Sequence, residues 1–426
     1  MTSKSRTHTI IGLLLLIALV IGACDSQITD PETSIHNKAT EQIVEGAPAF
    51  EDQLGDGCLR WRDSEDFSAF RKTADQPDWP TCKEVREQRK QKIETTFNAL
   101  KALYRATTTN SSEWLTNRGW DTTNVPTSME AFNDWYGLTV VGGDLTGLTL
   151  DIWIDLTEPL PPEIGNLTNL TRLQLAYGLT GPIPPEIGNL TNLLHLDIDL
   201  GSNQPWEPIP AWIGNLTNLR SLYLNWVNLA NPIPKEIGNL TNLTRLGLGG
   251  SLCISKEIGN LTNLTHLSQW SSIQCTIPKE IGNLTNLTRL QLAHVLTGPI
   301  PKEIGNLTNL THLHLRGFGR SGNLEGPIPK EIGNLINLTV LKLDGIYGNG
   351  GLTGLIPKEI GNLTNLTYFH LNQNQLTGEL PQGLVGATKM EDLRFQENAG
   401  LCAPANTEFQ TWLNGISTVN GPTCSN

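Results

Sequence analysis

The stretch IGNLTNL, from Ile164 to Leu170, decides the fold because nearly the same string returns again and again along the chain. Its isoleucine recurs at Ile164, Ile187, Ile213, Ile237, Ile258, Ile281, Ile304, Ile332 and Ile360. The steps between these positions run from 21 to 28 residues. A period in the twenties is the signature of a solenoid, in which every repeat is one structural unit stacked on the next.

Each repeat contains one short predicted strand. The first repeat strand is expected at Leu145, Leu148 and Leu150. In the next one, Leu170, Leu173 and Leu175 place apolar side chains toward the interior, whereas Arg172 and Gln174 face outward, because side chains alternate along a strand. A single repeat cannot bury this apolar row. Repeats stacked about 4.8 Å apart make the row continuous and pair neighbouring strands in a parallel sheet.

The segment IPKEIGNLTNL, Ile300 to Leu310, predicts the opposite wall of each repeat. Its proline lacks a backbone donor, and its Gly-Asn pair suits a tight turn. We therefore expect 3₁₀ or irregular turns on an outer, convex side.

The longer phrase LTGPIPKEIGNLTNLTHLHL, Leu296 to Leu315, resembles the plant-type leucine-rich repeat of receptor ectodomains and of secreted inhibitors of cell-wall enzymes. The resemblance covers residues 145–401. It implies an α/β solenoid: a leucine-rich-repeat superhelix with a concave parallel β-sheet, a convex 3₁₀ wall, a helical N-terminal cap and a disulfide-closed C-terminal cap. Asn374 and Asn398 fit the family's coil-tying asparagine, which the coil that begins at Ala176 lacks.

The N-terminus predicts export and a lipid anchor. Lys4 and Arg6 precede an apolar run from Ile10 to Ile21, which is too short to span a bilayer and is typical of a signal peptide. The run ends in Ile-Gly-Ala-Cys24, which resembles the bacterial lipobox, so Cys24 is expected to carry acyl chains such as palmitate. An ordinary secretory signal with a chance cysteine is the alternative.

These features divide the chain into five parts. We expect a signal peptide (1–23), a lipid-anchored flexible tether (24–56), an N-terminal cap region (57–144), the repeats (145–398) and a C-terminal cap (399–426). The predicted location is the bacterial cell envelope, either on the cell surface or facing the periplasm.

Apart from Cys24, the six remaining cysteines fall into local pairs, as expected of a chain exported to an oxidising compartment. The predicted pairs are Cys58 with Cys82, Cys253 with Cys275, and Cys402 with Cys424. The middle pair lies five and six residues before its repeat isoleucines, so the two cysteines occupy adjacent columns on neighbouring coils, within disulfide reach. Metal binding is the rival reading, but no CxxC or HExxH motif supports it.

Both ends of the repeats carry cap signals. Thr81 and Glu84 form a capping-box pattern that opens a helix to about Ala106, followed by tryptophans expected in a buried cap cluster rather than a sugar platform. At the C-terminus, Thr407 and Gln410 fit a second capping box before apolar residues that can cover the open core.

The outward strand positions form the candidate binding site. The net charge of −12 argues against non-specific nucleic-acid binding, yet one column is basic: Arg172, His195, Arg245, His266, Arg289 and His312, interrupted by Ser221. Around it lie Tyr177, Tyr223, Trp226, Trp270 and His314. Arginine and aromatic side chains dominate binding hot spots, so this concave face predicts a protein or polysaccharide partner of negative charge. The alternative is a solvated face kept by repeat duplication.

The sequence therefore predicts a monomeric recognition or adhesion protein without catalysis, cofactor or metal. A periplasm-facing scaffold or enzyme inhibitor is the alternative, and a hydrolase using Asp197 with Glu207 is a weaker one. Histidines titrating near the reference pKa of about 6.5 would tighten binding as pH falls.

Overall fold

The computed structural model describes residues 82–107, 115–116, 118–150, 159–175, 181–199, 209–225, 233–250, 252–317, 324–345 and 351–425. The chain forms two compact units, Met1–Lys92 and Ile93–Asn426. The signal peptide, the tether with Cys24, and the Cys58–Cys82 pair lie outside the described side chains. No helix in the described ranges combines the length and apolar character needed to cross a membrane.

Helix α5 (Cys82–Arg105) confirms the helix that was predicted to run to about Ala106. In its C-terminal part, Ile93, Phe97 and Leu100 are buried because they recur at helical spacing on one face. Phe97 meets Trp135 edge to face at 6.3 Å, and Trp120 lies 5.3 Å from the same ring. Trp120 and Trp135 therefore belong to a buried cap cluster, as predicted, and not to an exposed platform.

A hairpin precedes the repeats. Strand β1 (Leu138–Val141) pairs antiparallel with β2 (Asp144–Leu150). The turn is made by Gly142 and Gly143, whose φ angles of 60° and 73° suit the twist of a two-residue hairpin loop. The sequence analysis predicted β2 as the first repeat strand and missed β1.

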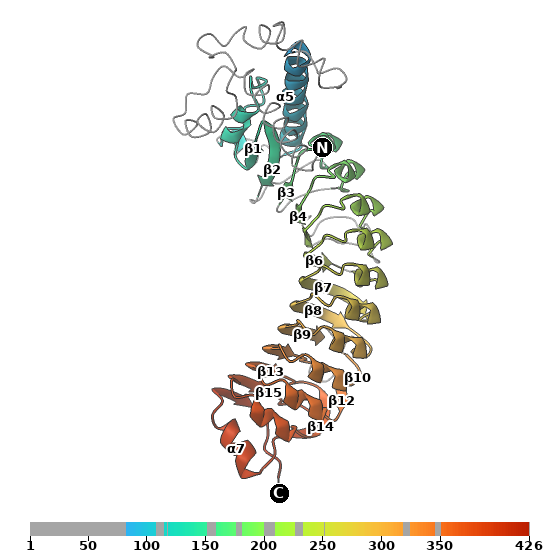
Figure 1. The fold of residues 1–426 in the computed structure, drawn as a ribbon, viewed down its shortest axis with the longest axis vertical. Coiled ribbons are helices and arrows are strands. Elements are labelled where there is room, and N and C mark those ends of the chain that lie inside the picture. Colours follow the sequence, from blue (N-terminus) through green and yellow to red (C-terminus); the bar gives the residue numbers. More distant parts are fainter. Residues whose placement is uncertain are drawn as a thin grey trace, which may run out of the picture. The chain divides into compact units, whose positions relative to one another are not determined.

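From β2 onward the strands run parallel in a 13-stranded sheet, one strand per repeat (Figure 1). The strands after β2 are β3 (Arg172–Leu175), β4 (His195–Asp199), β5 (Ser221–Asn225), β6 (Arg245–Gly250), β7 (His266–Cys275), β8 (Arg289–Leu296), β9 (His312–Gly317), β11 (Val340–Lys342), β13 (Tyr368–His370), β15 (Asp392–Arg394) and β17 (Thr418–Asn420).

The opposite side of the repeats consists of short 3₁₀ helices, which confirms the predicted wall (Figure 1). They are η3 (Pro162–Asn166), η4 (Pro185–Asn189), η5 (Ala211–Asn215), η6 (Lys235–Asn239), η7 (Lys256–Asn260), η8 (Lys279–Asn283), η9 (Lys302–Asn306), η10 (Lys330–Asn334), η11 (Lys358–Asn362) and η12 (Gln382–Gly386). In nearly all of them a proline precedes the first residue, because its fixed φ suits the helix entry.

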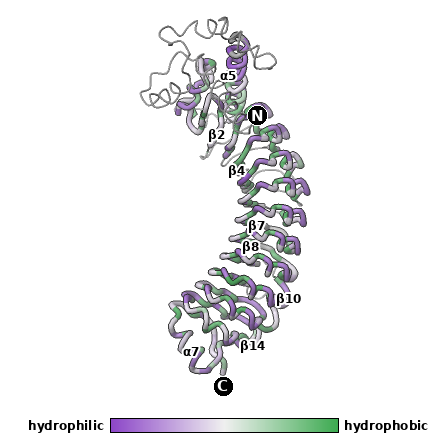
Figure 2. The backbone as a smooth tube through the Cα atoms, in the orientation of Figure 1, coloured by the Kyte–Doolittle hydropathy of each residue, from purple (hydrophilic) through white to green (hydrophobic). Residues whose placement is uncertain are grey.

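The core is a stack of leucine and isoleucine rows between the sheet and the 3₁₀ wall. Leu290, Leu313 and Leu341 are fully buried, one above the next, and Ile281 and Ile304 fill the other side. Figure 2 shows the resulting alternation of hydrophobic and hydrophilic segments along the backbone of each repeat. Burying one such side chain contributes about 1.5–3 kcal/mol, so the repeated rows supply most of the stabilisation.

Polar ladders add links between neighbouring repeats. From β4 to β13, the asparagine three residues before the strand donates from Nδ2 to a backbone carbonyl of the preceding repeat, as from Asn286 to Thr262 at 2.9 Å. The threonine before the strand does the same through Oγ1, as from Thr288 to Thr265 at 3.0 Å. Asn374 also bonds to neighbouring backbone, accepting from Leu352 N at 2.9 Å, which confirms its predicted coil-tying role.

The C-terminal repeats carry a second, four-stranded sheet that the sequence analysis did not predict. Its strands are β10 (Gly326–Pro327), β12 (Leu352–Gly354), β14 (Gln375–Glu379) and β16 (Gly400–Cys402).

The C-terminal cap contains α7 (Thr407–Leu413), with Phe409 and Leu413 buried against the last repeat. The predicted capping box is wrong by one residue: Asn406 is the N-cap, and its side chain accepts from Phe409 N at 3.0 Å. Gln410 instead donates to Pro404 O.

Two of the predicted disulfides are confirmed. Cys253 joins Cys275 across adjacent coils with a Cα–Cα distance of 5.2 Å, and Cys402 joins Cys424 at 4.9 Å.

Candidate functional site

One outward row of the parallel sheet collects the basic side chains. We call it the cationic row, and it comprises Arg172, His195, Ser221, Arg245, His266, Arg289 and His312. Each member is the direct cross-strand partner of the next, so the row runs across strands β3 to β9. The structure thus brings these predicted residues together, and their role in binding stays a prediction.

Side-chain alternation explains why the row faces solvent. Leu290 and Leu313, which follow Arg289 and His312, point into the core and are fully buried. Arg172, Arg245 and Arg289 are exposed. The inward leucines therefore hold the charged residues at fixed positions on the outer face of the sheet.

A second outward row lies two residues further along each strand. From β5 to β11 it consists of Tyr223, Gly247, Ser268, Gln291, His314 and Lys342. Neither row contains a carboxylate between β5 and β11, whereas Asp197 and Asp199 lie on β4. The positive charge is therefore concentrated on the middle of the sheet face, a term that we use for these two rows.

The structure describes two of the four aromatic residues that were predicted around the row. Tyr223 is partly buried in the second row, and Trp270, two residues beyond Ser268 on β7, is 46% exposed. Tyr177 and Trp226 lie outside the described residues.

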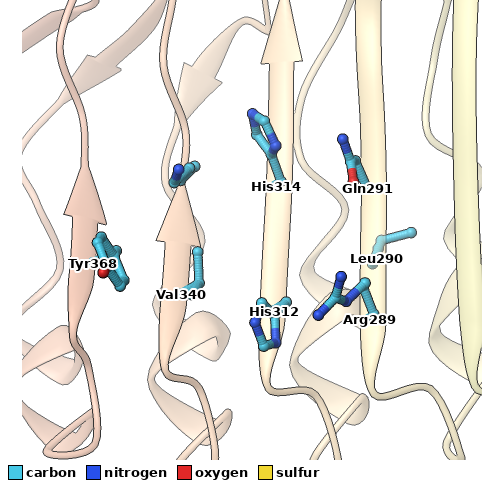
Figure 3. A pocket seen from close by; sticks show the side chains of 8 residues that line it. Arg289, Leu290, Gln291, His312, His314, Val340 and Tyr368 are labelled. Atoms are coloured by element: carbon cyan, nitrogen blue, oxygen red, sulfur yellow. The ribbon is translucent and has the colours of Figure 1, made fainter.

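A pocket of about 240 Å³ opens at the C-terminal end of the cationic row (Figure 3). Its lining comes from four neighbouring strands: Arg289, Leu290, Gln291, His312, His314, Val340, Lys342 and Tyr368. Arg289 and Tyr368 lie on opposite sides of it, on β8 and β13 (Figure 3). No acidic side chain lines the pocket.

The pocket exists because Val340 is short. Val340 pairs with His312 on one side and with Tyr368 on the other, so a small apolar residue occupies a row position flanked by larger side chains. Lys342 extends from the next row and places Nζ 5.8 Å from the centroid of the Tyr368 ring. The sequence analysis identified neither Val340 nor the pocket. It selected row positions that carry arginine or histidine, and Val340 is neither.

The histidines of the cationic row have lowered pKa values. Partial burial is the main cause for His195, His266 and His312, and the flanking arginines add a smaller electrostatic contribution of the same sign. The expectation that they titrate near 6.5 is therefore corrected: at neutral pH they are neutral, and the permanent charge of the row belongs to its arginines.

His314 deviates furthest, because burial and the nearby cations lower its pKa to about 4. The charged groups that act on it are Lys342, Arg316 and His370, and its Nε2 is buried without a hydrogen-bond partner.

A cluster of ionisable side chains lies on β13, which also carries the pocket residue Tyr368, and on the neighbouring β15. Asp392 accepts from Arg394 Nε at 2.9 Å and Nη2 at 2.8 Å, and His370 Nε2 lies 3.1 Å from Asp392 Oδ2. Asp344, on the neighbouring coil, is 9% exposed, and burial raises its pKa. The strand register brings Asp392 beside His370, and the sequence analysis did not identify this carboxylate.

The arrangement suits the binding of anions more than catalysis. Arginine and lysine side chains project from a rigid sheet, and the histidines between them can donate hydrogen bonds. Among the described residues, no group of three or more His, Cys, Asp or Glu side chains could hold a metal ion. Glu207, the proposed partner of Asp197 in hydrolysis, lies outside the described residues, so the pair has no geometry to support it.

Comparison with known proteins identifies leucine-rich repeats in the chain. Residues 148–251 and 251–351 each match a family model described as a leucine-rich repeat region. No curated protein matches the chain.

Among solved structures, the chain is similar to a plant ice-binding protein, with 22% identity and a TM-score of 0.51, over 78% of this chain and 98% of that one. It is also similar to a leucine-rich-repeat protein of Leptospira interrogans, with 27% identity, 74% and 82% coverage, and a TM-score of 0.46. A plant peptide hormone receptor solved with its ligand RGF2 matches at 27% identity over 67% of this chain, with a TM-score of 0.40; the match spans 60% of the receptor chain. The likeness to the ice-binding protein shows the fold alone.

Proposed function

The chain is a leucine-rich-repeat protein, and we propose that it binds an acidic partner protein through its sheet face. Leucine-rich-repeat solenoids are typical protein-binding scaffolds, because their stacked strands present an extended, rigid surface. The cationic row is the observation that carries the proposal: from β5 to β11 it places Arg245 and Arg289 two strands apart, with no carboxylate beside them in either outward row.

Electrostatics favour this surface over the rest of the molecule. The chain as a whole has a net charge of −12, so a cationic face is a local exception that attracts an anionic partner and orients it. Arginine is also among the residue types that dominate binding hot spots, because its planar guanidinium binds a carboxylate through two hydrogen bonds. The scaffold would act by recognition, without turnover.

The experiment that tests the proposal is affinity capture with the soluble repeat domain and two charge-reversed forms of it. The first form carries Arg172→Glu, Arg245→Glu and Arg289→Glu on the exposed sheet face. The matched control carries the same number of reversals on the 3₁₀ wall: Lys235→Glu, Lys279→Glu and Lys302→Glu, all at exposed positions. Both forms should melt like the parent, since exposed substitutions usually change stability by less than about 0.5 kcal/mol.

We expect one acidic protein to be retained by the parent and the control and lost by the sheet-face form. Retention by all three forms would move the site away from the sheet face. Capture of an acidic polysaccharide in place of a protein would replace the proposed partner class.

We further propose that the protein is a lipoprotein of the bacterial cell envelope, anchored through Cys24. The lipobox-like Ile-Gly-Ala-Cys24 after a short apolar run supports this anchor. Cys24→Ser should abolish incorporation of labelled fatty acid and release the protein from membranes, and unchanged membrane attachment would contradict it. Protease added to intact cells then separates two roles: removal of the repeats indicates surface recognition, and protection indicates a periplasm-facing scaffold or inhibitor.

A further inference from the structure

The permanent cations in the middle of the sheet face occur on alternate strands. Arg245 lies on β6, Arg289 on β8 and Lys342 on β11, and one strand separates each pair in the sheet order. Neighbouring strands lie about 4.8 Å apart, so Arg245 and Arg289, which share a row, are about 9.6 Å apart across the sheet. Lys342 lies the same number of strands beyond Arg289 and two residues further along its strand. The intervening strands carry His266 and His312, which are neutral at pH 7 because burial lowers their pKa values.

Lys342 continues this order of alternate strands although it belongs to the second row. Its Nζ lies over the ring of Tyr368, a residue in register with the cationic row, and Lys342 lines the same pocket as Arg289. The short side chain of Val340 leaves the space between Arg289 and Lys342 open. A ligand that runs across the strands therefore meets the cation of Arg245, the neutral imidazole of His266 and the cation of Arg289. It reaches the pocket between Arg289 and Lys342.

Among extended peptides, only one regular conformation matches this interval. A polyproline-II helix has three residues per turn and rises about 3.1 Å per residue, so every third side chain points to the same side at intervals of about 9.3 Å. A β-strand repeats on one side every second residue, at about 6.7 Å, and turns its third residue away.

We propose that the sheet face recognises a polyproline-II segment with an acidic residue at every third position, whose carboxylates bind Arg245, Arg289 and Lys342 in turn. The inference deepens the proposed function and rests on it. The carboxylate that binds Lys342 would enter the pocket above Val340. Such a segment also loses little conformational freedom on binding, because proline holds it in the bound conformation beforehand.

The chemistry of the pocket favours a peptide carboxylate over an acidic sugar. A sugar ring needs an open aromatic face and paired acceptors for its hydroxyl groups, and the described lining offers only Gln291 as a side-chain amide and no carboxylate. Lys342 covers a face of the Tyr368 ring, and the Tyr368 hydroxyl is engaged in a hydrogen bond with Glu391 at 3.2 Å. The ammonium group of Lys342 beside the small apolar side chain of Val340 instead suits a carboxylate.

The test compares two peptides that carry the same number of glutamates. In the first, Glu-Pro-Pro repeats place the carboxylates on one side of the polyproline helix. In the second, Glu-Pro-Pro-Pro repeats keep the conformation and the charge but rotate successive carboxylates around the helix. We expect the first peptide to bind about tenfold more tightly, because only its carboxylates reach successive cations together.

Single variants then locate the contact. Arg289→Gln should reduce binding of the Glu-Pro-Pro peptide to the level of the other peptide, and the matched wall variant Lys302→Gln should leave both affinities unchanged. Equal affinities for the two peptides, both lowered by Arg289→Gln, would overturn the spacing and leave the proposed function in place. Binding of polygalacturonate more tightly than either peptide would overturn the carboxylate-peptide inference.

The capture experiment separates the remaining outcome. If neither peptide binds but the sheet-face form still loses a captured acidic protein, the inference fails alone. If neither peptide binds and no protein is lost, both fail.

Discussion

His314 illustrates how the neighbours of one side chain change its chemistry. It occupies an outward strand position, yet it is only partly accessible, and burial together with Lys342 and Arg316 lowers its pKa to about 4. Its Nε2 has no hydrogen-bond partner. Protonation of His314 is therefore disfavoured in the folded protein relative to the unfolded chain.

This difference predicts acid sensitivity with a defined sign. Between about pH 6.5 and pH 4, His314 is protonated in the unfolded chain and neutral in the folded protein. The free energy of unfolding therefore falls as pH falls through this window. A shift from 6.5 to about 4 corresponds to at most about 3 kcal/mol when complete.

His314→Gln should therefore lose less stability than the parent when urea melts at pH 7 are compared with melts at pH 4.5. His195→Gln, at an exposed position of the cationic row, is the matched control and should change the pH dependence little. Parallel pH profiles for the parent and His314→Gln would contradict the account.

At the residue scale the sequence predicted orientation better than chemistry. The alternation of Leu173 with Arg172 and Gln174 gave the inward and outward sides, and the constant repeat gave the register of the cationic row. The pKa of His314 was not predictable, because it depends on Lys342, a repeat away in sequence and adjacent in space. The pocket was not predicted for the same reason: it depends on neighbours that are distant in sequence. The short side chain of Val340 leaves a pocket only because the larger His312 and Tyr368 lie on either side of it.

At the element scale, the glycine of each Ile-Gly-Asn triplet sets how closely the 3₁₀ helices stack. Gly305 is buried, and a Cβ added there would meet Glu331 O of the next repeat at 2.5 Å. Gly282 and Gly333 face the corresponding carbonyls at 2.6 Å and 2.4 Å. The 3₁₀ wall therefore requires glycine for close backbone approach, not for an unusual φ.

Gly305→Ala should destabilise the repeats by about 1–3 kcal/mol, the range for forcing extra atoms into a packed contact. Gly386→Ala is the control, because an added Cβ there would first meet Thr364 Cγ2 at an ordinary 3.4 Å. Thermal melts of the two variants measure the difference, and equal melting temperatures would show that neighbouring 3₁₀ helices can move apart without cost.

The elements that were predicted are those that repeat. The strands and the 3₁₀ wall followed from a motif seen many times, so errors in one copy did not matter. The hairpin strand β1, the four-stranded second sheet and the Asn406 cap occur in single or divergent copies. There, a local pattern such as Thr407 with Gln410 competes with an equally good one a residue earlier, and only the packed structure decides between them.

At the scale of the whole molecule, the sequence repeat sets the distances between charged side chains on the sheet. Each repeat adds one strand, and each strand adds one outward position to the row, so the distance between two charges depends on the number of repeats between them. Such a surface recognises the spacing of a partner's charges as well as their sign. The sequence predicted the basic face, but the alternate-strand spacing with Lys342 became visible only with the full strand order.

The most direct measurement of the central claim is site-specific photo-cross-linking of the acidic partner from two sides of the repeats. A photoreactive residue at Ser268 or Gln291 probes the sheet face, and one at Lys279 or Lys302 probes the 3₁₀ wall. We predict that the partner is cross-linked from the sheet-face positions and that Arg289→Glu abolishes this product. Cross-linking from the wall positions, with none from Ser268 or Gln291, would contradict binding through the sheet face.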